Sequence, residues 1–417
     1  MSKMEIVKDK ILQKDKSLSL PKGWEIKKLG EVCDVIGGGT PSKKNLKFYD
    51  GNILWATVRD MKCDTISETE YQITEEAVKK SSTNIIPKGN IIIATRVGLG
   101  KVCLLQNDTA INQDLRGVIP KSTKKIDNVY LFHWFRSISQ TIIKEGTGAT
   151  VQGVKLPFIK DLNIPLPPLS EQHRIVSILD RSFAAIDKAK ANAEQNLKNA
   201  KELFESYLEG VFENGNWEEK SIQEITKVIN GYAFASEDFS PTNSLRSIKI
   251  TNVGVKEFIE EYDNNLPDKY NVVSKEFQVK TGDIVIALTR TIISTGLKVA
   301  IVPSTYDGAL VNQRVAALVP NESLISRTYL YNYLISRRVF KYVLNHVNTL
   351  MQPNLSIVDL KNMPVPFPTI TEQQTIARQL DSLRAETQKL ESIYSKKILA
   401  LEELKKSILQ KAFRGEL

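Results

Sequence analysis

A proline-rich segment that leads into a long amphipathic segment occurs twice in this chain of 417 residues. The first copy, IPLPPLSEQ, spans residues 164–172, and the second, VPFPTITEQ, spans residues 365–373, an offset of 201 residues. Alternating prolines hold the backbone extended, and Ser170 or Thr371 can supply an oxygen to the unpaired amides of a first helical turn. The repeat therefore predicts an internally duplicated chain in which each copy starts a helix.

The segments that follow the two copies carry apolar residues at alternating steps of four and three, the spacing of a coiled coil. We expect helices over residues 170–213 and 370–417, each about 60 Å long. Because one globular domain cannot cover so long a stripe, the two helices are expected to pack on each other. The expected seam comprises Leu179, Phe183, Ile186, Leu197, Phe204, Leu380, Leu383, Leu390, Leu401, Leu404 and Ile408.

The duplication extends to the regions before each helix. Trp24 and Trp217 match, as do the predicted strands at residues 89–94 and 282–287, and β-rich runs occur at 53–58 and 248–253. The sequence thus predicts an α+β chain with two mixed α/β domains, at residues 21–169 and 214–369. Residues 1–20 are expected to form an N-terminal extension.

Bulk composition narrows the classes of function. The formal net charge of +9 favours a polyanionic partner, although the second globular region is nearly neutral. Three widely spaced cysteines form neither a disulfide framework nor a CxxC metal site, so we expect a reducing cytoplasm. No apolar run reaches the roughly 18 residues of a membrane span.

Catalytic motifs are missing from the sequence. Residues 98–101, GLGK, lack the first glycine of a P-loop, and Val102 stands where its Ser or Thr would be. The pair Pro167-Pro168 follows Leu166, so it does not form an amino-methyltransferase motif. Three histidines without HExxH, and no GxSxG, leave little for metal or triad chemistry. We expect no cofactor, no metal and no catalysis by this chain.

The ordered set of motifs resembles the specificity subunit of type I restriction-modification enzymes. The set comprises GGTPS at 38–42, residues 55–60 and 89–94, INQ at 111–113, the Pro-x-Pro-x-x-Ser-Glu-Gln segment and residues 404–413. The resemblance covers nearly the whole chain. The second copy departs from it, with NGYAF at 230–234 in place of the GGTP loop.

The resemblance implies a non-catalytic recognition subunit. Two target-recognition domains would each bind half of a split site on double-stranded DNA with pseudo-twofold symmetry. The two helices would pack antiparallel as a spacer and offer docking surfaces to two methyltransferase subunits, with restriction (motor-nuclease) subunits joining the complex.

Several side chains are candidates for DNA contact. Arg96 and Arg290 follow predicted strands at comparable places, and Gln113, Gln313 and Arg314 lie in matching turns, where arginine can contact guanine and glutamine adenine. For each of them the alternative is an ordinary solvated or locally bonded side chain. The remaining candidates are Lys43, Lys44, Arg59, Arg116, Tyr232 and Arg246.

Two other classes of function stay open at this point. One is a stand-alone DNA-modifying enzyme, which the missing catalytic motifs oppose. The other is a coiled-coil scaffold without DNA binding, which the nearly neutral second half favours.

Overall fold

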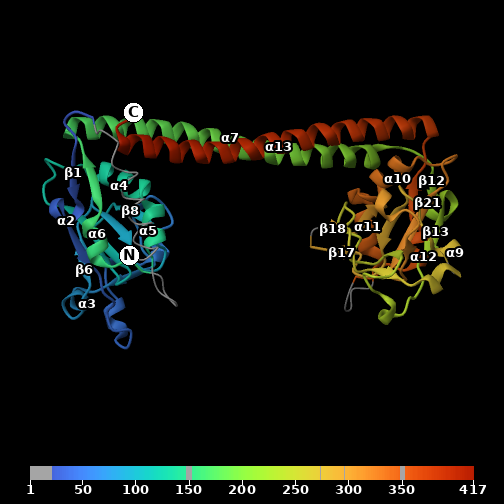
Figure 1. The fold of residues 1–417 in the computed structure, drawn as a ribbon, viewed down its shortest axis with the longest axis horizontal. Coiled ribbons are helices and arrows are strands. Elements are labelled where there is room, and N and C mark those ends of the chain that lie inside the picture. The colour runs from blue at the N-terminus through green and yellow to red at the C-terminus, as the bar shows by residue number, and fades with distance from the viewer. Residues whose placement is uncertain (1–20, 147–152, 273, 295, 348–352) are drawn as a thin grey trace, which may run out of the picture. The chain divides into compact units, whose positions relative to one another are not determined.

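The computed structural model describes residues 21–146, 153–272, 274–294, 296–347 and 353–417. The expected N-terminal extension, residues 1–20, lies outside the described residues. The chain forms two compact units. The first contains the described residues up to Asn192 together with Lys397–Leu417, and the second contains Ala193–Lys396. Each unit therefore has one globular part and a segment of both long helices (Figure 1). The expected domain limits at residues 169 and 369 stay a prediction.

The globular part of the first unit contains two main sheets. The five-stranded sheet has the order β2-β10-β7-β8-β4, and the four-stranded sheet has the order β5-β3-β9-β6. A separate antiparallel pair joins β1 (Glu25–Lys28) to β11 (Asn163–Leu166), the strand that carries the first proline-rich segment. The other strands are β2 (Cys33–Gly37), β3 (Ile53–Ala56), β4 (Thr65–Ile66), β5 (Tyr71–Ile73), β6 (Asn84–Ile86), β7 (Ile91–Ala94), β8 (Val102–Leu105), β9 (Thr109–Ile111) and β10 (Leu115–Pro120).

Short helices surround these sheets. They are α2 (Leu29–Val32), α3 (Glu75–Lys79), α4 (Asn128–Ser137), α5 (Ser139–Glu145) and α6 (Leu156–Asp161), with 3-10 turns at η1 (Leu46–Tyr49) and η2 (Val58–Asp60). Helix α4 is buried almost throughout, and its Tyr130 and Trp134 share one core cluster with Ile91 of β7 and Leu179 of the first long helix. The globular part and the long helices of this unit thus share one core.

The second unit repeats this plan. Its four-stranded sheet has the order β13-β21-β16-β19, and β13 pairs with β21 from Thr226↔Pro320, as β2 pairs with β10 from Cys33↔Pro120. The strands are β12 (Glu219–Ser221), β13 (Thr226–Asn230), β14 (Leu245–Ile248), β15 (Asn265–Leu266), β16 (Ile284–Ala287), β17 (Ile292–Ile293), β18 (Gly296–Leu297), β19 (Val299–Ile301), β20 (Leu310–Val311), β21 (Val315–Pro320) and β22 (Pro364–Pro366). The helices and 3-10 turns are α8 (Ile222–Ile225), α9 (Ser274–Phe277), α10 (Arg327–Leu334), α11 (Arg337–His346), α12 (Ile357–Asn362), η3 (Ser236–Asp238), η4 (Asp268–Val272) and η5 (Ser304–Tyr306).

One expected strand of the second unit is wrong. Strand β14 ends at Ile248, and a turn follows where a strand over residues 248–253 was expected. Asn252 makes the turn, because its side-chain Oδ1 accepts a bond of 2.8 Å from the Lys249 amide while its backbone amide donates to the Lys249 carbonyl at 3.0 Å. Asparagine commonly competes with the sheet in this way.

The two long helices are α7 (Leu169–Asn214) and α13 (Ile370–Arg414), close to the expected limits. The N-cap expected for α13 is wrong by two residues, because Thr369 caps the helix in place of Thr371. The Thr369 hydroxyl accepts a bond from the Glu372 amide and donates to the Glu372 carboxylate. Ser170 likewise lies inside the first turn of α7.

The repeated glutamine explains why the proline-rich segment recurs. Gln172 is fully buried, accepts a bond from the Asp127 amide and donates to the carbonyls of Lys125 and Pro167. Gln373 makes the matching three bonds, to the Ser326 amide and the carbonyls of Leu324 and Pro368. Each glutamine thus fixes the start of a long helix against the N-terminus of α4 or α10.

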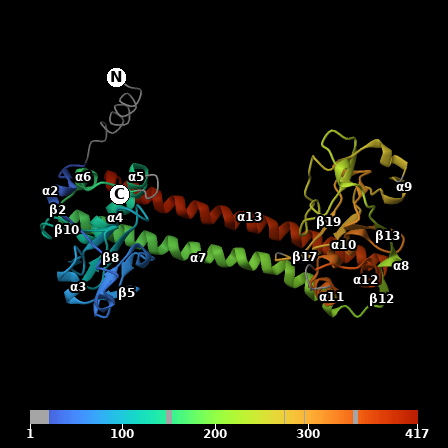
Figure 2. The same cartoon turned by 90° about the horizontal axis from the view of Figure 1, so that it is seen from below.

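Within each unit the segments of α7 and α13 run antiparallel (Figures 1 and 2). In the first unit Asp187 pairs with Lys405 and Lys190 with Glu402, so the chain direction is opposite in the two helices. In the second unit Tyr207 bonds to Gln379, and Arg384 lies over the ring of Phe204.

The expected seam is largely but not wholly buried. Leu179, Phe183, Ile186, Phe204 and Leu380 are buried, and Leu197, Leu383, Leu401 and Ile408 are partly buried. Leu390 and Leu404 were expected in the seam but are 37% and 47% exposed. The reason is that polar side chains occupy seam positions of α13. The covered stripe runs through Ala377, Leu380, Arg384, Thr387, Glu391, Tyr394, Ile398, Leu401, Lys405, Ile408 and Ala412.

Candidate nucleic-acid interface

The glycine loop and the Asn-Gln turn of the first unit form one continuous structure. An added Cβ on Gly38 would overlap the Asn112 carbonyl oxygen, and the Gly39 amide donates to the Ile111 carbonyl at 3.0 Å. The Thr40 hydroxyl donates to the side-chain oxygen of Gln113. The loop therefore holds the turn, and with it the candidate side chain of Gln113, in a defined position.

A hollow of about 710 Å³ lies beside this turn. Three aromatic side chains line it in edge-to-face contact, with ring centres 5.8 Å apart for Tyr49 and Trp55 and 6.3 Å apart for Trp55 and Tyr71. The Trp55 indole N–H donates to the carbonyl of Gly39 and to the Thr83 hydroxyl, both at 3.2 Å. The hollow thus shares its frame with the glycine loop.

The structure gathers three of the predicted DNA-contacting residues around this hollow. Lys43, Arg59 and Gln113 all line it, and Arg59 and Gln113 are exposed. Arg59 is 3.6 Å from the Glu70 carboxylate, a solvent-exposed pair that contributes little free energy. Lys44 is exposed but does not line the hollow. Cationic and amide side chains therefore surround an aromatic surface.

Two further arginines contact the Asn-Gln turn itself. Arg96 lies 3.6 Å from Asp114, the residue after Gln113. Arg116 donates to the backbone carbonyls of Gln113 and Leu115, and burial, together with the charge of Arg96, lowers its pKa. Arg116 thus supports the turn, whereas Arg96 extends from its edge.

The second unit has the same frame with different side chains. An added Cβ on Gly231 would overlap the Asn312 carbonyl, as at Gly38, so the loop that departs in sequence keeps its glycine at the constrained position. The Tyr232 amide donates to Val311 at 2.8 Å, and the Gln313 amide donates to Tyr232 at 2.9 Å. Both Gln313 and Arg314 are exposed at this turn.

The other candidate DNA-contacting residues of the second unit do not all lie at this turn. Tyr232 belongs to an aromatic cluster with Phe234, Tyr270 and Phe277. Arg246 stacks over the Tyr306 ring at 5.0 Å, a cation–π contact. Arg290 has a left-handed backbone, with φ of 49°, and its amide donates to Asn354 at 3.2 Å. The structure therefore brings only Tyr232, Gln313 and Arg314 to one turn.

The sequence analysis missed the aromatic side chains and Asp114. Tyr49 and Tyr71 come from η1 and β5, short elements far apart in sequence, and no spacing marks them as neighbours. Asp114 directly follows the predicted Asn-Gln pair, and its counterpart in the second unit is Arg314 (114 + 200 = 314). A comparison of the two repeats in the sequence could have found this change from an acidic to a basic side chain at matching positions.

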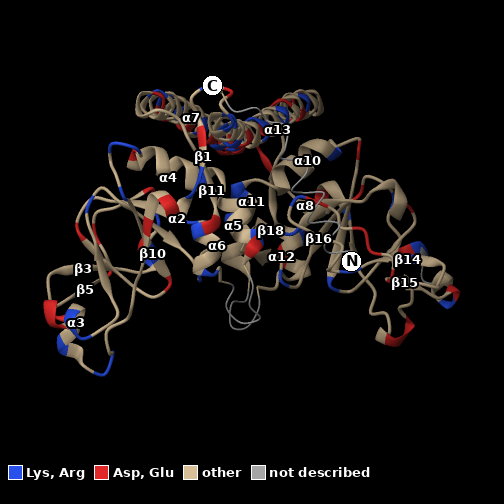
Figure 3. Ribbon diagram, turned by 60° about the vertical axis from the view of Figure 1, so that its left-hand side comes forward, with Lys and Arg blue, Asp and Glu red and all other residues tan. Residues whose placement is uncertain are grey.

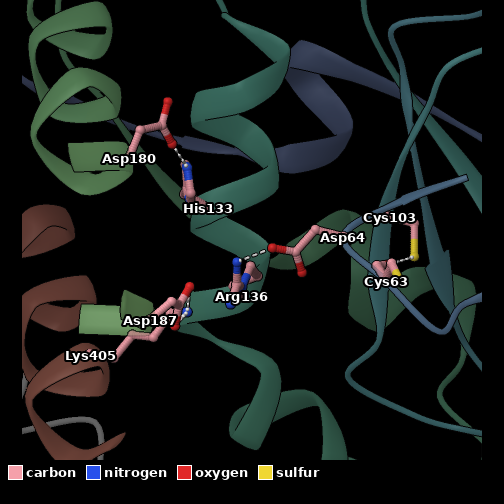
Figure 4. Close-up of polar contacts among 8 residues, drawn as sticks. All are labelled: Cys63, Asp64, Cys103, His133, Arg136, Asp180, Asp187 and Lys405. Atoms are coloured by element: carbon pink, nitrogen blue, oxygen red, sulfur yellow. Dashed lines mark hydrogen bonds and ion pairs between the residues drawn. The ribbon is translucent and has the colours of Figure 1, made fainter. Parts of the chain in front are cut away.

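A polar network joins the first globular part to the long helices (Figure 4). From α4, His133 Nε2 lies 3.1 Å from Asp180 of α7, and Arg136 bonds to Asp64 at 2.8 Å. Burial lowers the pKa of His133, although Asp180 opposes the shift. These contacts position the globular part relative to its own helix segments and suggest no chemistry.

Cys103, which lies near this network, is not a reactive nucleophile. Cys33, Cys63 and Cys103 are free thiols. Cys103 is buried, its thiol lies 3.0 Å from the Cys63 carbonyl, and burial raises its pKa to about 12. A thiol with so high a pKa is protonated at neutral pH and a poor nucleophile.

Charges of both signs are interspersed over both units and along both long helices (Figure 3). In the described part of the chain, no cluster of three or more His, Cys, Asp or Glu side chains could hold a metal ion. Nor does any helix in the described ranges have the length and apolarity to cross a membrane.

Comparison with known proteins places the chain in a family. The family described as "Type I restriction modification DNA specificity domain" matches residues 21–198 and 214–399. The chain therefore belongs to the DNA specificity family of type I restriction-modification systems, a family whose members are recognition subunits.

Individual relatives agree with this assignment. The chain is 27% identical over 430 residues to the type I restriction enzyme MjaIX specificity subunit of Methanocaldococcus jannaschii, covering 95% of this chain and 94% of that one. It is 33% identical over 207 residues to the EcoR124I/EcoR124II specificity subunit of Escherichia coli, covering 48% and 51%. The solved HsdS subunit from Thermoanaerobacter tengcongensis shares the fold, with a TM-score of 0.68, 21% identity and coverage of 97% and 100%.

Proposed function

We propose that this chain directs methyltransferase and restriction subunits of a type I complex to a bipartite site on double-stranded DNA, with one half-site bound by each globular part. The observation that carries the proposal is the repeated frame. Gly38 with Asn112, and Gly231 with Asn312, hold matching Asn-Gln turns in place, while the side chains around the two turns differ. Two equal frames with different exposed side chains suit two half-sites of different sequence.

In the first unit, the group around the hollow is the proposed reading surface. Gln113 can bond bidentately to adenine, Arg59 to guanine or phosphate, and Lys43 to phosphate. The aromatic rings of Tyr49 and Tyr71 offer apolar contact to base edges or sugars. Arg96, at the edge of the same turn, is proposed to contact the backbone or an adjoining base.

In the second unit, the proposed reading residues are Gln313, Arg314 and Tyr232, which meet at one turn. Arg314 replaces the acidic Asp114, so the second unit presents a cation where the first presents a carboxylate. Lys44, Arg246 and Arg290 are proposed as phosphate contacts outside the two turns. Because the chain would act on cellular DNA, we propose that it works in the cytoplasm.

A domain exchange tests the division of labour. Residues 21–163 are replaced by the matching part of a relative with a known target, the variant is co-expressed with its methyltransferase, and methylated sites are mapped across a genome. We expect one half of the bipartite site to change and the other to persist. A change in both halves would refute separate readers, and an unchanged site would refute reading by the first unit.

Point variants test the surfaces themselves. Arg59→Ala and Arg314→Ala should each weaken binding and relax sequence preference at one position, by about 1 to 3 kcal/mol if the contact is to a base. Lys198→Ala, at an exposed position on α7, removes the same charge far along the chain and serves as the control. Mobility shifts on mixed duplexes also separate this function from a scaffold without DNA binding, and methyl transfer by the purified chain alone would instead indicate an enzyme.

A further inference from the structure

A hollow of about 750 Å³ in the second unit lies between α7 and the globular part. Glu205 and Glu209 of α7 line one side, and Lys256 and Ser336 line the other. Apolar side chains, among them Leu297 and Ile335, complete the lining and are almost fully buried. The hollow therefore combines an apolar floor with charged and polar groups, the composition of a specific binding site.

Two side chains that line this hollow each have a buried polar atom without a hydrogen-bond partner. Glu209 accepts a bond of 2.6 Å from the Arg337 amide through Oε1, but its buried Oε2 accepts none. The hydroxyl of Ser336, a residue only 1% exposed, is also unpaired. Buried polar atoms are nearly always satisfied in proteins. Two such atoms on side chains that line one hollow make it a candidate for binding a polar group.

The equivalent place in the first unit lacks this feature. Ser137, the counterpart of Ser336 (137 + 199 = 336), donates its hydroxyl to the Trp134 carbonyl at 2.6 Å. The counterpart of Glu209 is Gln410 (209 + 201 = 410), and that of Glu205 is Lys406. The unpaired carboxylate oxygen and the unpaired hydroxyl thus belong to the second unit and are not a general property of the repeat.

The charges around Glu209 indicate which group would satisfy it. Glu205 is paired with Lys256 at 2.5 Å and Glu213 with Lys341 at 3.4 Å, whereas Glu209 receives only a backbone amide. Burial raises the pKa of Glu209, and the charges of Glu213 and Glu205 raise it further, while the amide and the charge of Arg337 oppose the shift. A cationic hydrogen-bond donor would offset both the burial and the like-charge repulsion.

An exposed apolar surface lies next to this hollow. Leu203 is 49% exposed and Tyr207 is 41% exposed, and both line a smaller hollow of about 440 Å³. Ser206 and Gly210 line both hollows, which therefore adjoin along α7. A segment with a basic side chain beside apolar ones fits this combined surface.

We propose that the hollow of the second unit receives a lysine or arginine side chain of a methyltransferase subunit, which bonds to Glu209 Oε2 and lies beside the Ser336 hydroxyl. The proposal rests on the proposed function for its partner. It further implies that the two methyltransferase copies are held differently, because the corresponding position of the first unit carries Gln410.

Stepwise assembly tests the proposal. The full chain and its methyltransferase are titrated against each other, and native mass spectrometry gives the affinity of each of the two copies. Glu209→Gln and the double variant Glu209→Gln/Ser336→Ala should weaken one copy by about ten- to a hundredfold and leave the other unchanged. Glu403→Gln, the same charge change on α13 in the first unit, is the control and should weaken neither.

A crosslinking measurement keeps the test independent of folding. A photoreactive amino acid at position 206 of the otherwise unchanged chain should crosslink to a methyltransferase segment that contains a lysine or arginine. Wild-type affinity of both copies for the double variant, or crosslinks only to a segment without a basic residue, would overturn the proposal. Failure of the wild-type chain to bind any methyltransferase would overturn the proposed function itself.

Discussion

The ammonium of Lys405 lies 5.0 Å from the centre of the Phe183 ring and 2.7 Å from the Asp187 carboxylate, in the first unit. The second unit contains the same contact with its members exchanged between the helices. Arg384, at the position that matches Phe183 (183 + 201 = 384), stacks 4.8 Å from the ring of Phe204, which matches Lys405 (204 + 201 = 405). In each unit the contact between the two long helices thus places a cation against a ring.

Removal of the Lys405 charge should destabilise the first unit. Lys405→Met keeps the aliphatic packing but loses the cation–π contact, at a cost of about 0.5 to 1 kcal/mol in the free energy of unfolding. Its control is Lys406→Met, whose side chain is exposed and pairs with Glu403. Urea unfolding followed by tryptophan fluorescence is a suitable measurement, since Trp24, Trp55 and Trp134 all lie in the first unit. Equal loss in both variants would show that the ring contact has no special weight.

The buried stripe of the helices can be tested with two leucines. Leu179 is fully buried, so Leu179→Ala should cost about 2 to 5 kcal/mol, whereas Leu404→Ala should change stability by no more than about 0.5 kcal/mol. Thermal unfolding of the two variants gives the comparison. A large loss at Leu404 would place that residue in the seam after all.

The first unit should lose stability in mild acid because of His133. Burial lowers the pKa of His133 in the folded state below its unfolded value of about 6.5, so the unfolded chain binds the proton more readily. Above about pH 6.5 the contribution of His133 to the free energy of unfolding is therefore constant. As the pH falls from there towards the folded pKa, this contribution becomes unfavourable.

His133→Asn introduces the residue that the second unit has at the matching position, Asn332 (133 + 199 = 332). The variant should show a smaller decrease in the free energy of unfolding between about pH 7.5 and about pH 5.5 than the wild type. Because Asp180 and Arg136 flank the imidazole, Asp180→Asn is a useful second variant, which should increase the acid sensitivity. Identical pH profiles for wild type and His133→Asn would contradict this account.

The duplication and the long helices could be predicted from sequence because they depend on local patterns. Proline spacing, a cap and a heptad period are all readable within a few residues. The exact stripe could not be predicted, since Arg384 and Lys405 occupy seam positions whose aliphatic stems pack while their charges meet rings. A seam assigned from the spacing of apolar residues alone includes Leu404 instead.

The candidate site was only partly predictable for a related physical reason. Gln113, Gln313 and Arg314 follow a strand and are visible as a turn motif. The hollow, however, is assembled from η1, β3 and β5, whose side chains meet only through sheet pairing, as Trp55 and Tyr71 do between β3 and β5. Sheet order is a long-range property, so the aromatic lining had no signature in spacing.

Gly38 offers a test that connects the fold to the reading of DNA. Its backbone lies so close to the Asn112 carbonyl that a Cβ has no room, whereas a Cβ on the preceding Gly37 would meet only the flexible Arg116 guanidinium at 3.4 Å. Gly38→Ala should therefore displace the Asn-Gln turn and weaken binding to the half-site of the first unit, while Gly37→Ala should have little effect. Gly231→Ala should do the same to the other half-site. Methylation mapping on duplexes that carry one intact and one randomised half-site separates the two outcomes, and full activity of Gly38→Ala on every duplex would show that this turn does not position the residues that read DNA.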